Sequence, residues 1–170
     1  MAILILNGST SIDGVNSKLL DSLEFTFPKY QFIKYSILAL PLFQVALDIN
    51  PLPDSVIQFR KKVSDADAVI ISTPVYIYNI PAVLKSALEW LTTSGELVDK
   101  KVLAITYTPN PPRGEKAMQS LLNSLKALDA NIVSSLSLHQ TELKIIDRKI
   151  SGAEQLELLS AGLDMLSSKS

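Results

Sequence analysis

Cysteine is absent from this chain of 170 residues, and histidine occurs once, at His139. The lack of cysteine excludes disulfide bonds, iron–sulfur clusters, thiolate zinc sites and a cysteine nucleophile. One histidine cannot form a multi-histidine metal site within a single chain. The sequence therefore predicts a functional site without a metal ion.

An excess of charge of either sign is also missing. Lysine and arginine number 16 and aspartate and glutamate 17, which gives a formal net charge of −1. No basic face is evident, and nucleic-acid binding proteins need one to neutralise phosphates. We therefore expect no nucleic-acid partner.

Long apolar runs are missing as well. None approaches the roughly 18 residues that a bilayer-spanning helix needs, so we expect no membrane partner. Residues 1–6 have no charged n-region and no cleavage site, so this stretch is expected to form a core strand and not a signal peptide. These observations together predict a cytoplasmic protein.

Apolar residues are plentiful, at 47% of the chain, against 19% charged residues. This composition and length predict one globular domain over residues 1–170. Five apolar strand-like stretches alternate with five helical patterns. The strands are expected at 2–6, 31–38, 67–73, 101–107 and 132–138, and the helices from residue 15 or 16 and at 55–66, 80–92, 115–128 and 153–166, with Asp54 as the N-cap of the second.

Strands that alternate with helices predict an α/β fold with a doubly wound parallel sheet and helices on both faces. With five strands, the expected order is 2-1-3-4-5. The loops that follow the first, third and fourth strands then converge on one crevice at the carboxyl edge of the sheet, where such folds bind ligands.

The first of these loops, residues 7–16, is small and rich in hydroxyl groups, including those of Ser9 and Ser11. A helix that begins just after it directs unpaired N–H groups toward the loop, which favours an anion. The loop lacks the Gly-Lys-Ser/Thr ending of a P-loop and the G-x-G-x-x-G pattern. An ordinary turn with a capping serine fits the same residues.

The second and third loops have unusual compositions. Tyr76, Ile77 and Tyr78 lie where polar residues are expected, which favours a flat apolar ligand, a subunit contact or packing beneath neighbouring loops. The third loop, residues 106–114, is proline-rich and ends with Arg113, which either pairs with a phosphate or is simply solvated.

Groups for acid–base chemistry are scarce around these loops. The chain has no G-x-S-x-G elbow, and nothing in the sequence pairs His139 with a nucleophilic serine. A pocket that binds phosphate and an aromatic ring but lacks such groups suits a flavin, which carries its own redox chemistry.

Three motifs resemble those of the NADPH-dependent FMN reductase family, a flavodoxin-like group. They are Gly8-Ser9 with Asn16 eight residues after the glycine; Thr73-Pro74-x-Tyr76 followed by Ile80-Pro81 and Leu84-Lys85-x-Ala87-Leu88-x-Trp90; and Leu40-Pro41-Leu42-Phe43. The resemblance extends from residue 1 to about residue 90.

The resemblance implies FMN as cofactor, NADPH or NADH as hydride donor, and free flavin, a quinone or another small molecule as acceptor. It implies that Ser9 and Asn16 bind the FMN phosphate, that residues 74–78 line the ring, and that the chain forms a homodimer or homotetramer. No protein side chain is expected to be catalytic. The candidate cofactor-binding residues are Ser9, Ser11, Asn16, Pro74, Val75, Tyr76, Ile77, Tyr78, Thr108 and Pro109.

The chain departs from the family pattern at several of these positions. Ser11 replaces an arginine and Gly14 a serine in the first loop, so one cation and one hydroxyl are missing near the phosphate. In the second loop Val75 replaces a glutamate and Ile77 an asparagine, and Tyr78 stands where the family often has a small residue. Two alternatives therefore stay open: a flavodoxin-like FMN-binding electron carrier, and a degenerate, flavin-free dimeric binding protein.

Overall fold

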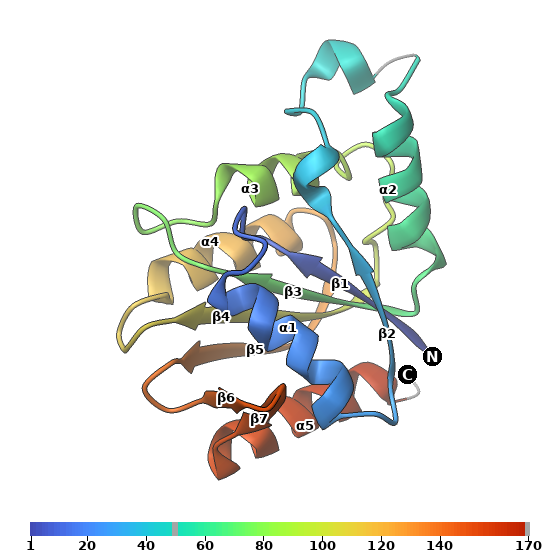
Figure 1. The fold of residues 1–170 in the computed structure, drawn as a ribbon. Coiled ribbons are helices and arrows are strands. Elements are labelled where there is room, and N and C mark those ends of the chain that lie inside the picture. Colours follow the sequence, from blue (N-terminus) through green and yellow to red (C-terminus); the bar gives the residue numbers. More distant parts are fainter. Residues whose placement is uncertain (49–50, 169–170) are drawn as a thin grey trace.

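The computed structural model describes residues 1–48 and 51–168, which form a five-stranded sheet between two layers of helices (Figure 1). Residues 49–50 and 169–170, which the predicted domain of residues 1–170 includes, lie outside the described residues. The main sheet consists of β1 (Ala2–Asn7), β2 (Gln31–Tyr35), β3 (Ala68–Thr73), β4 (Lys101–Thr108) and β5 (Asn131–His139). The helices are α1 (Val15–Thr26), α2 (Asp54–Asp65), α3 (Ala82–Glu89), α4 (Glu115–Lys126) and α5 (Ala153–Ser167), with 3-10 turns η1 (Ile37–Ala39) and η2 (Val45–Asp48).

All neighbouring strands of the sheet are parallel, in the order β2-β1-β3-β4-β5. This order confirms the prediction. The central register aligns Leu4 of β1 with Ile33 on one side and Val69 on the other. Because β1 and β3 are covered on both faces, their residues are apolar without alternation, as parallel sheets require.

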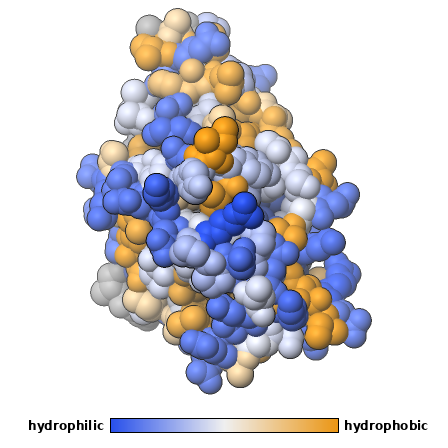
Figure 2. Space-filling view, turned by 90° about the vertical axis from the view of Figure 1, so that its left-hand side faces the viewer, coloured by the Kyte–Doolittle hydropathy of each residue, from blue (hydrophilic) through white to orange (hydrophobic). Residues whose placement is uncertain are grey.

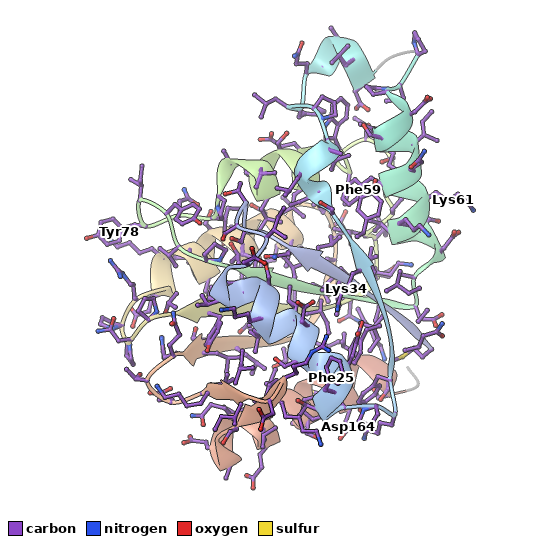
Figure 3. The ribbon with its side chains drawn as sticks, in the orientation of Figure 1. Phe25, Lys34, Phe59, Lys61, Tyr78 and Asp164 are labelled. Carbon is purple, nitrogen blue, oxygen red and sulfur yellow. The ribbon has the colours of Figure 1, made fainter. Side chains whose placement is uncertain are left out.

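One face of the sheet packs against α2, α3 and α4. Leu4 and Ile71 contribute to this core, and Phe59 and Trp90 fill it from the helical side. Figure 3 shows Phe59 projecting from α2 toward the sheet, whereas Lys61 points away from it. The spacing of buried residues in α2 thus follows the helical period.

The opposite face packs against α1 and α5. Ile3 and Ile70 lie in this second core with Leu19 of α1 and Leu163 of α5. The neighbouring Gly162 lets α5 approach β4 closely, because a Cβ there would lie 3.1 Å from Leu103 Cδ1. The two helical layers leave the loops at the carboxyl edge of the sheet as the place where ligands can enter.

Two predicted boundaries are wrong. The second strand ends at Tyr35 and not at residue 38, because the Ser36 hydroxyl accepts a hydrogen bond from the Leu38 N–H and starts the 3-10 turn η1. Asp54 is not an N-cap but the first residue of α2. Pro53 occupies the cap position, and its carbonyl accepts hydrogen bonds from the N–H groups of Val56 and Ile57.

The third helix is shorter than the predicted 80–92. It begins at Ala82 after Pro81, and single turns replace it beyond Glu89. A small antiparallel hairpin, β6 (Lys144–Ile146) with β7 (Lys149–Ser151), follows β5 and was not predicted. Its strands of three residues are too short for a periodicity to be recognised.

Candidate functional site

The loops that follow β1, β3 and β4 meet at the carboxyl edge of the sheet, on the left of Figure 1. The Gly8 N–H donates a 2.7 Å hydrogen bond to the carbonyl of Ser72 and ties the first loop to the end of β3. A Cβ at Gly8 would lie 2.8 Å from Leu84 Cδ2, closer than real contacts allow. Glycine is therefore required for this close approach of the first loop to α3.

The first loop presents hydrogen-bond donors toward the edge. The buried Ser9 hydroxyl accepts a 3.1 Å hydrogen bond from the Ser11 N–H, and among the described residues it finds no acceptor for its own proton. Within the described chain, α1 starts after Gly14 without a side-chain cap or an acidic residue in its first turn. Its first N–H groups have no partner within the helix, so this side of the site suits an anion.

The Asn16 side chain is hydrogen-bonded within the chain. Its side chain is only 1% exposed, and its Nδ2 donates a 3.2 Å hydrogen bond to the carbonyl of Tyr107. Its Oδ1 accepts a 2.8 Å hydrogen bond from the Ser72 hydroxyl. The amide therefore connects α1 to β3 and β4 and positions the first loop. Its second Nδ2 proton has no acceptor among the described residues.

The second loop is a tight turn closed by two reciprocal hydrogen bonds between Tyr76 and Asn79, of 3.0 and 2.9 Å. Its central residues, Ile77 and Tyr78, have φ values of 50° and 59°. Left-handed backbone is uncommon for residues other than glycine and is a strained outlier for a β-branched residue. The Ile77 side chain is 96% exposed and Tyr78 is 74% exposed, and Figure 3 shows Tyr78 at the outer tip of the turn.

The third loop is held at its base by a buried hydrogen-bond chain. The Thr108 hydroxyl donates a 2.7 Å hydrogen bond to the carbonyl of Arg113, and it lies 2.9 Å from Nδ1 of His139. Because the hydroxyl has only one proton, His139 Nδ1 must be the donor of the second bond, which assigns its tautomer. The single histidine therefore fixes the loop after β4 to the end of β5.

A pocket of about 290 Å³ opens between the three loops. Ser9, Ser11 and the start of α1 lie on one side, and Pro74, Tyr76 and Pro109 lie on the other. Figure 2 views the molecule from this edge, where polar and apolar side chains are mixed around a hollow. The pocket is lined by Ser9, Ser11, Gly14, Val15, Asn16, Pro74, Val75, Tyr76, Tyr107, Thr108, Pro109, Arg113 and Gln140.

The structure brings every predicted site residue to this pocket except two. Ile77 lines neither this pocket nor the neighbouring cavity that Tyr78 lines. The positive φ values at the tip of the turn direct both side chains outward. The sequence indicated an apolar loop at this place but not which of its side chains would face the ligand.

Five lining residues are not among the predicted cofactor-binding residues: Gly14, Val15, Tyr107, Arg113 and Gln140. Tyr107 is the next-to-last residue of β4, and burial raises the pKa of its phenol, which donates a hydrogen bond to the carbonyl of Leu143. Gln140 follows β5 directly, and no local feature of the sequence indicates that the end of this strand reaches the pocket. For Arg113 the sequence left phosphate pairing and simple solvation open, and the structure places it in the pocket lining.

The pocket fits a phosphorylated aromatic cofactor. Hydroxyl and helix N–H donors suit a phosphate, and the prolines with Tyr76 suit a flat ring. Its lining contains neither a carboxylate nor a histidine, and among residues 1–48 and 51–168 no cluster of three or more metal-ligating side chains occurs. Such a pocket can hold and orient FMN but offers little acid–base chemistry of its own.

Comparisons with known proteins agree with this arrangement. A family profile described as NADPH-dependent FMN reductase matches residues 1–142. A subunit of NADH:(hydroxy)cinnamate reductase, CrdA of Vibrio ruber, is 42% identical over 107 residues, which cover 62% of this chain and 52% of that protein. A 2-hydroxy-1,4-benzoquinone reductase of a Burkholderia species is 33% identical over 91 residues, covering 53% and 49% of the two chains. The chain thus spans about half the length of these relatives.

Solved structures share the fold. The NAD(P)H:(acceptor) oxidoreductase FerB of Paracoccus denitrificans superposes with a TM-score of 0.79 at 21% identity, covering 98% of this chain and 97% of that one. An apo NADH:FMN oxidoreductase, EMOB, gives a TM-score of 0.70 at 18% identity, covering 99% and 90%. At these identities the superpositions establish the flavodoxin-like fold alone. In the part of the chain that the structure describes, no helix is long and apolar enough to cross a membrane.

Proposed function

Since the chain belongs to the NADPH-dependent FMN reductase family, we propose that it is an FMN-dependent NAD(P)H oxidoreductase. One observation carries the proposal: three loops at the carboxyl edge build a pocket with anion-binding donors on one side and a flat apolar wall on the other. The reaction moves one hydride from the nicotinamide, by way of FMN, to a small acceptor. A quinone acceptor takes up the hydride and one proton from water and becomes the hydroquinone. The two electrons of the hydride account for this two-electron reduction.

The phosphate side of the pocket belongs to the first loop. Ser9 can donate its free hydroxyl proton, and the N–H groups of Val15 and Asn16 at the start of α1 add backbone donors. Arg113 supplies the cation that this loop lacks at Ser11. Helix N-termini and arginine are both suited to phosphate recognition.

The ring side of the pocket belongs to the second and third loops. Pro74 and Val75 form one wall, Tyr76 adds a ring face, and Pro109 faces them from the third loop. Bound FMN would supply the hydride chemistry itself, and the protein would contribute position and exclusion of water. The absence of a carboxylate and a histidine from the pocket lining supports this division of roles.

Steady-state NADPH oxidation tests the proposal. The purified chain, reconstituted with FMN and gel-filtered, is expected to oxidise NADPH with a quinone as acceptor at a rate that scales with its FMN content. The same preparation without FMN serves as the control. Equal rates with and without FMN would contradict the proposal.

The acceptor, assembly and location are also proposed. Relatives named as benzoquinone and quinone reductases support a quinone or another small aromatic acceptor.

The exposed apolar side chains of Leu42, Val45 and Ile77 support a homodimer or homotetramer, because such side chains gather at subunit contacts. The cytoplasmic location rests on the sequence alone. The electron-carrier and flavin-free alternatives gain no support from the comparisons.

A further inference from the structure

A second cavity adjoins the proposed flavin pocket at the carboxyl edge. It has a volume of about 550 Å³ and lies between the tip of the second loop and the third loop. The two cavities share Val75 and Arg113, so a molecule in the second cavity borders the ring side of the first. The second cavity is lined by Val75, Tyr78, Asn110, Pro111, Pro112, Arg113, Gly114, Glu115 and Lys116.

The walls of this cavity combine flat apolar surfaces with cations. Pro111 and Pro112 are rigid and apolar and the Tyr78 ring is planar, and aromatic rings pack well against such surfaces. Arg113 and Lys116 carry two positive charges against the single carboxylate of Glu115. In the described chain, none of these three charged groups forms an ion pair.

Lys116 is already placed toward an aromatic ring. Its Nζ lies 5.1 Å from the centroid of the Tyr78 ring, within the range of a cation–π contact. The left-handed backbone at Ile77 and Tyr78 brings that ring to the mouth of the cavity. The arrangement therefore presents a ring face and an ammonium group side by side.

We propose that this second cavity binds the electron acceptor and favours planar aromatic anions. The acceptor ring lies against Tyr78 and the two prolines, and its anionic group pairs with Lys116, while Arg113 stays with the FMN phosphate. The inference rests on the proposed function, because an acceptor site needs a bound flavin beside it. The anionic group itself is not altered, and the quinone ring takes up the hydride and one proton.

Another cavity also borders the flavin pocket and provides a contrast. It lies between α1 and β6, has a volume of about 220 Å³, and includes Lys18 and Lys144. It shares no residue with the 74–76 wall of the flavin pocket. A cation there does not lie beside the ring side, so Lys18 is a matched control for Lys116.

The kinetic test uses two acceptors that differ by one anionic group, 1,4-naphthoquinone and its 2-sulfonate. The measured quantity is the ratio of kcat/KM for the sulfonate to that for the neutral quinone, with FMN-loaded protein and saturating NADPH. Lys116→Gln is expected to lower this ratio about fivefold, as for a partly exposed ion pair. Lys18→Gln is expected to leave the ratio unchanged, and added salt should lower it only when Lys116 is present.

A second test measures acceptor-site binding without turnover. Naphthalene-2-sulfonate, which accepts no hydride, is titrated into oxidised, FMN-loaded protein and followed by the change in flavin absorbance. Its Kd is expected to rise about fivefold in Lys116→Gln and to stay constant in Lys18→Gln.

Two results would overturn the inference while the proposed function stands: turnover of both quinones with a ratio that Lys116→Gln does not change, or a Kd that responds only to Lys18→Gln. The absence of FMN-dependent turnover with either quinone would remove the proposed function and this inference with it.

Discussion

Ser9 lies in the first loop and Asn16 in the first turn of α1, and their contacts within the chain differ. Both match the family motif for phosphate binding. The Asn16 amide also bridges Tyr107 and Ser72 inside the chain, whereas the Ser9 hydroxyl accepts one local hydrogen bond from the Ser11 N–H. The residue type could be predicted to matter from its spacing after Gly8. Its partners could not, because they lie 56 and 91 positions further along the chain.

Asn16→Ala is expected to destabilise the fold more than it weakens FMN binding. The change leaves the buried Ser72 hydroxyl and the Tyr107 carbonyl without their partner, which costs about 2–3 kcal/mol in the free energy of unfolding. Urea denaturation of the FMN-free protein measures this loss. A variant of unchanged stability whose FMN affinity nevertheless collapses would show that the amide contacts the ligand directly.

Ser9→Ala is expected to show the opposite pattern. Stability should change little, and FMN affinity should fall roughly 10-fold or more, because a hydrogen bond to a charged phosphate is lost. Fluorescence titration with FMN measures the Kd. The control is Ser64→Ala on the exposed side of α2, which should bind FMN like the unmodified chain. Equal affinities of the two variants would place the phosphate elsewhere.

At the scale of elements, the strands could be predicted almost completely and the turns only in part. Continuous apolar runs identify β1 and β3 because both of their faces are covered. The turn at Ile77 and Tyr78 could not be predicted, because a β-branched residue disfavours the left-handed backbone that it adopts there. The backbone preference of isoleucine does not decide the conformation here, because the chain must reverse direction between β3 and α3.

Ile77→Asn is expected to stabilise the second loop. Asparagine tolerates the left-handed backbone, and the 96% exposed isoleucine side chain loses almost no contacts within the chain. The free energy of unfolding should rise by about 0.5–1 kcal/mol, measured by urea denaturation at a concentration where the chain is monomeric. A loss of stability of the same size would contradict this expectation, because it would mean that the Ile77 side chain makes a stabilising contact.

Arg60 joins three elements, and its removal is expected to be costly. It pairs with Asp48 of η2 at 2.5 Å and donates to the carbonyl of Trp90 beyond α3. The Asp48 side chain is only 5% exposed, so Arg60→Met leaves a buried carboxylate without its cation and should cost about 3–5 kcal/mol. Thermal or urea unfolding of Arg60→Met beside Lys61→Met measures the difference. The Lys61 pair with Asp65 is exposed and should contribute under about 1 kcal/mol, so equal losses would contradict the account.

At the scale of the whole molecule, the site depends on strand order. The order β2-β1-β3-β4-β5 places β1, β3 and β4 side by side, so the loops that follow them are neighbours at one edge. That order was predictable because the number of alternating strands and helices leaves few topologies. Gln140 could not be assigned to the site, since nothing local indicates that the end of β5 reaches it.

Ligand binding to the native state should raise the stability of the whole molecule. FMN at about 100 times its Kd is expected to add about 2.7 kcal/mol, which for a chain of this size raises Tm by roughly 5–10 °C. Riboflavin, which lacks the phosphate, should give a clearly smaller shift at the same concentration. Equal shifts from both flavins would contradict the assignment of the first loop to the phosphate.

The most direct test of the central claim is an anaerobic absorbance titration of the FMN-reconstituted protein. FMN should co-elute with the chain, its visible absorbance should be bleached by one equivalent of NADPH or NADH, and it should return on addition of one equivalent of quinone. A chain that retains no FMN, or whose bound FMN keeps its colour with both nicotinamides, would contradict the claim that this pocket is the site of a flavin-dependent reductase.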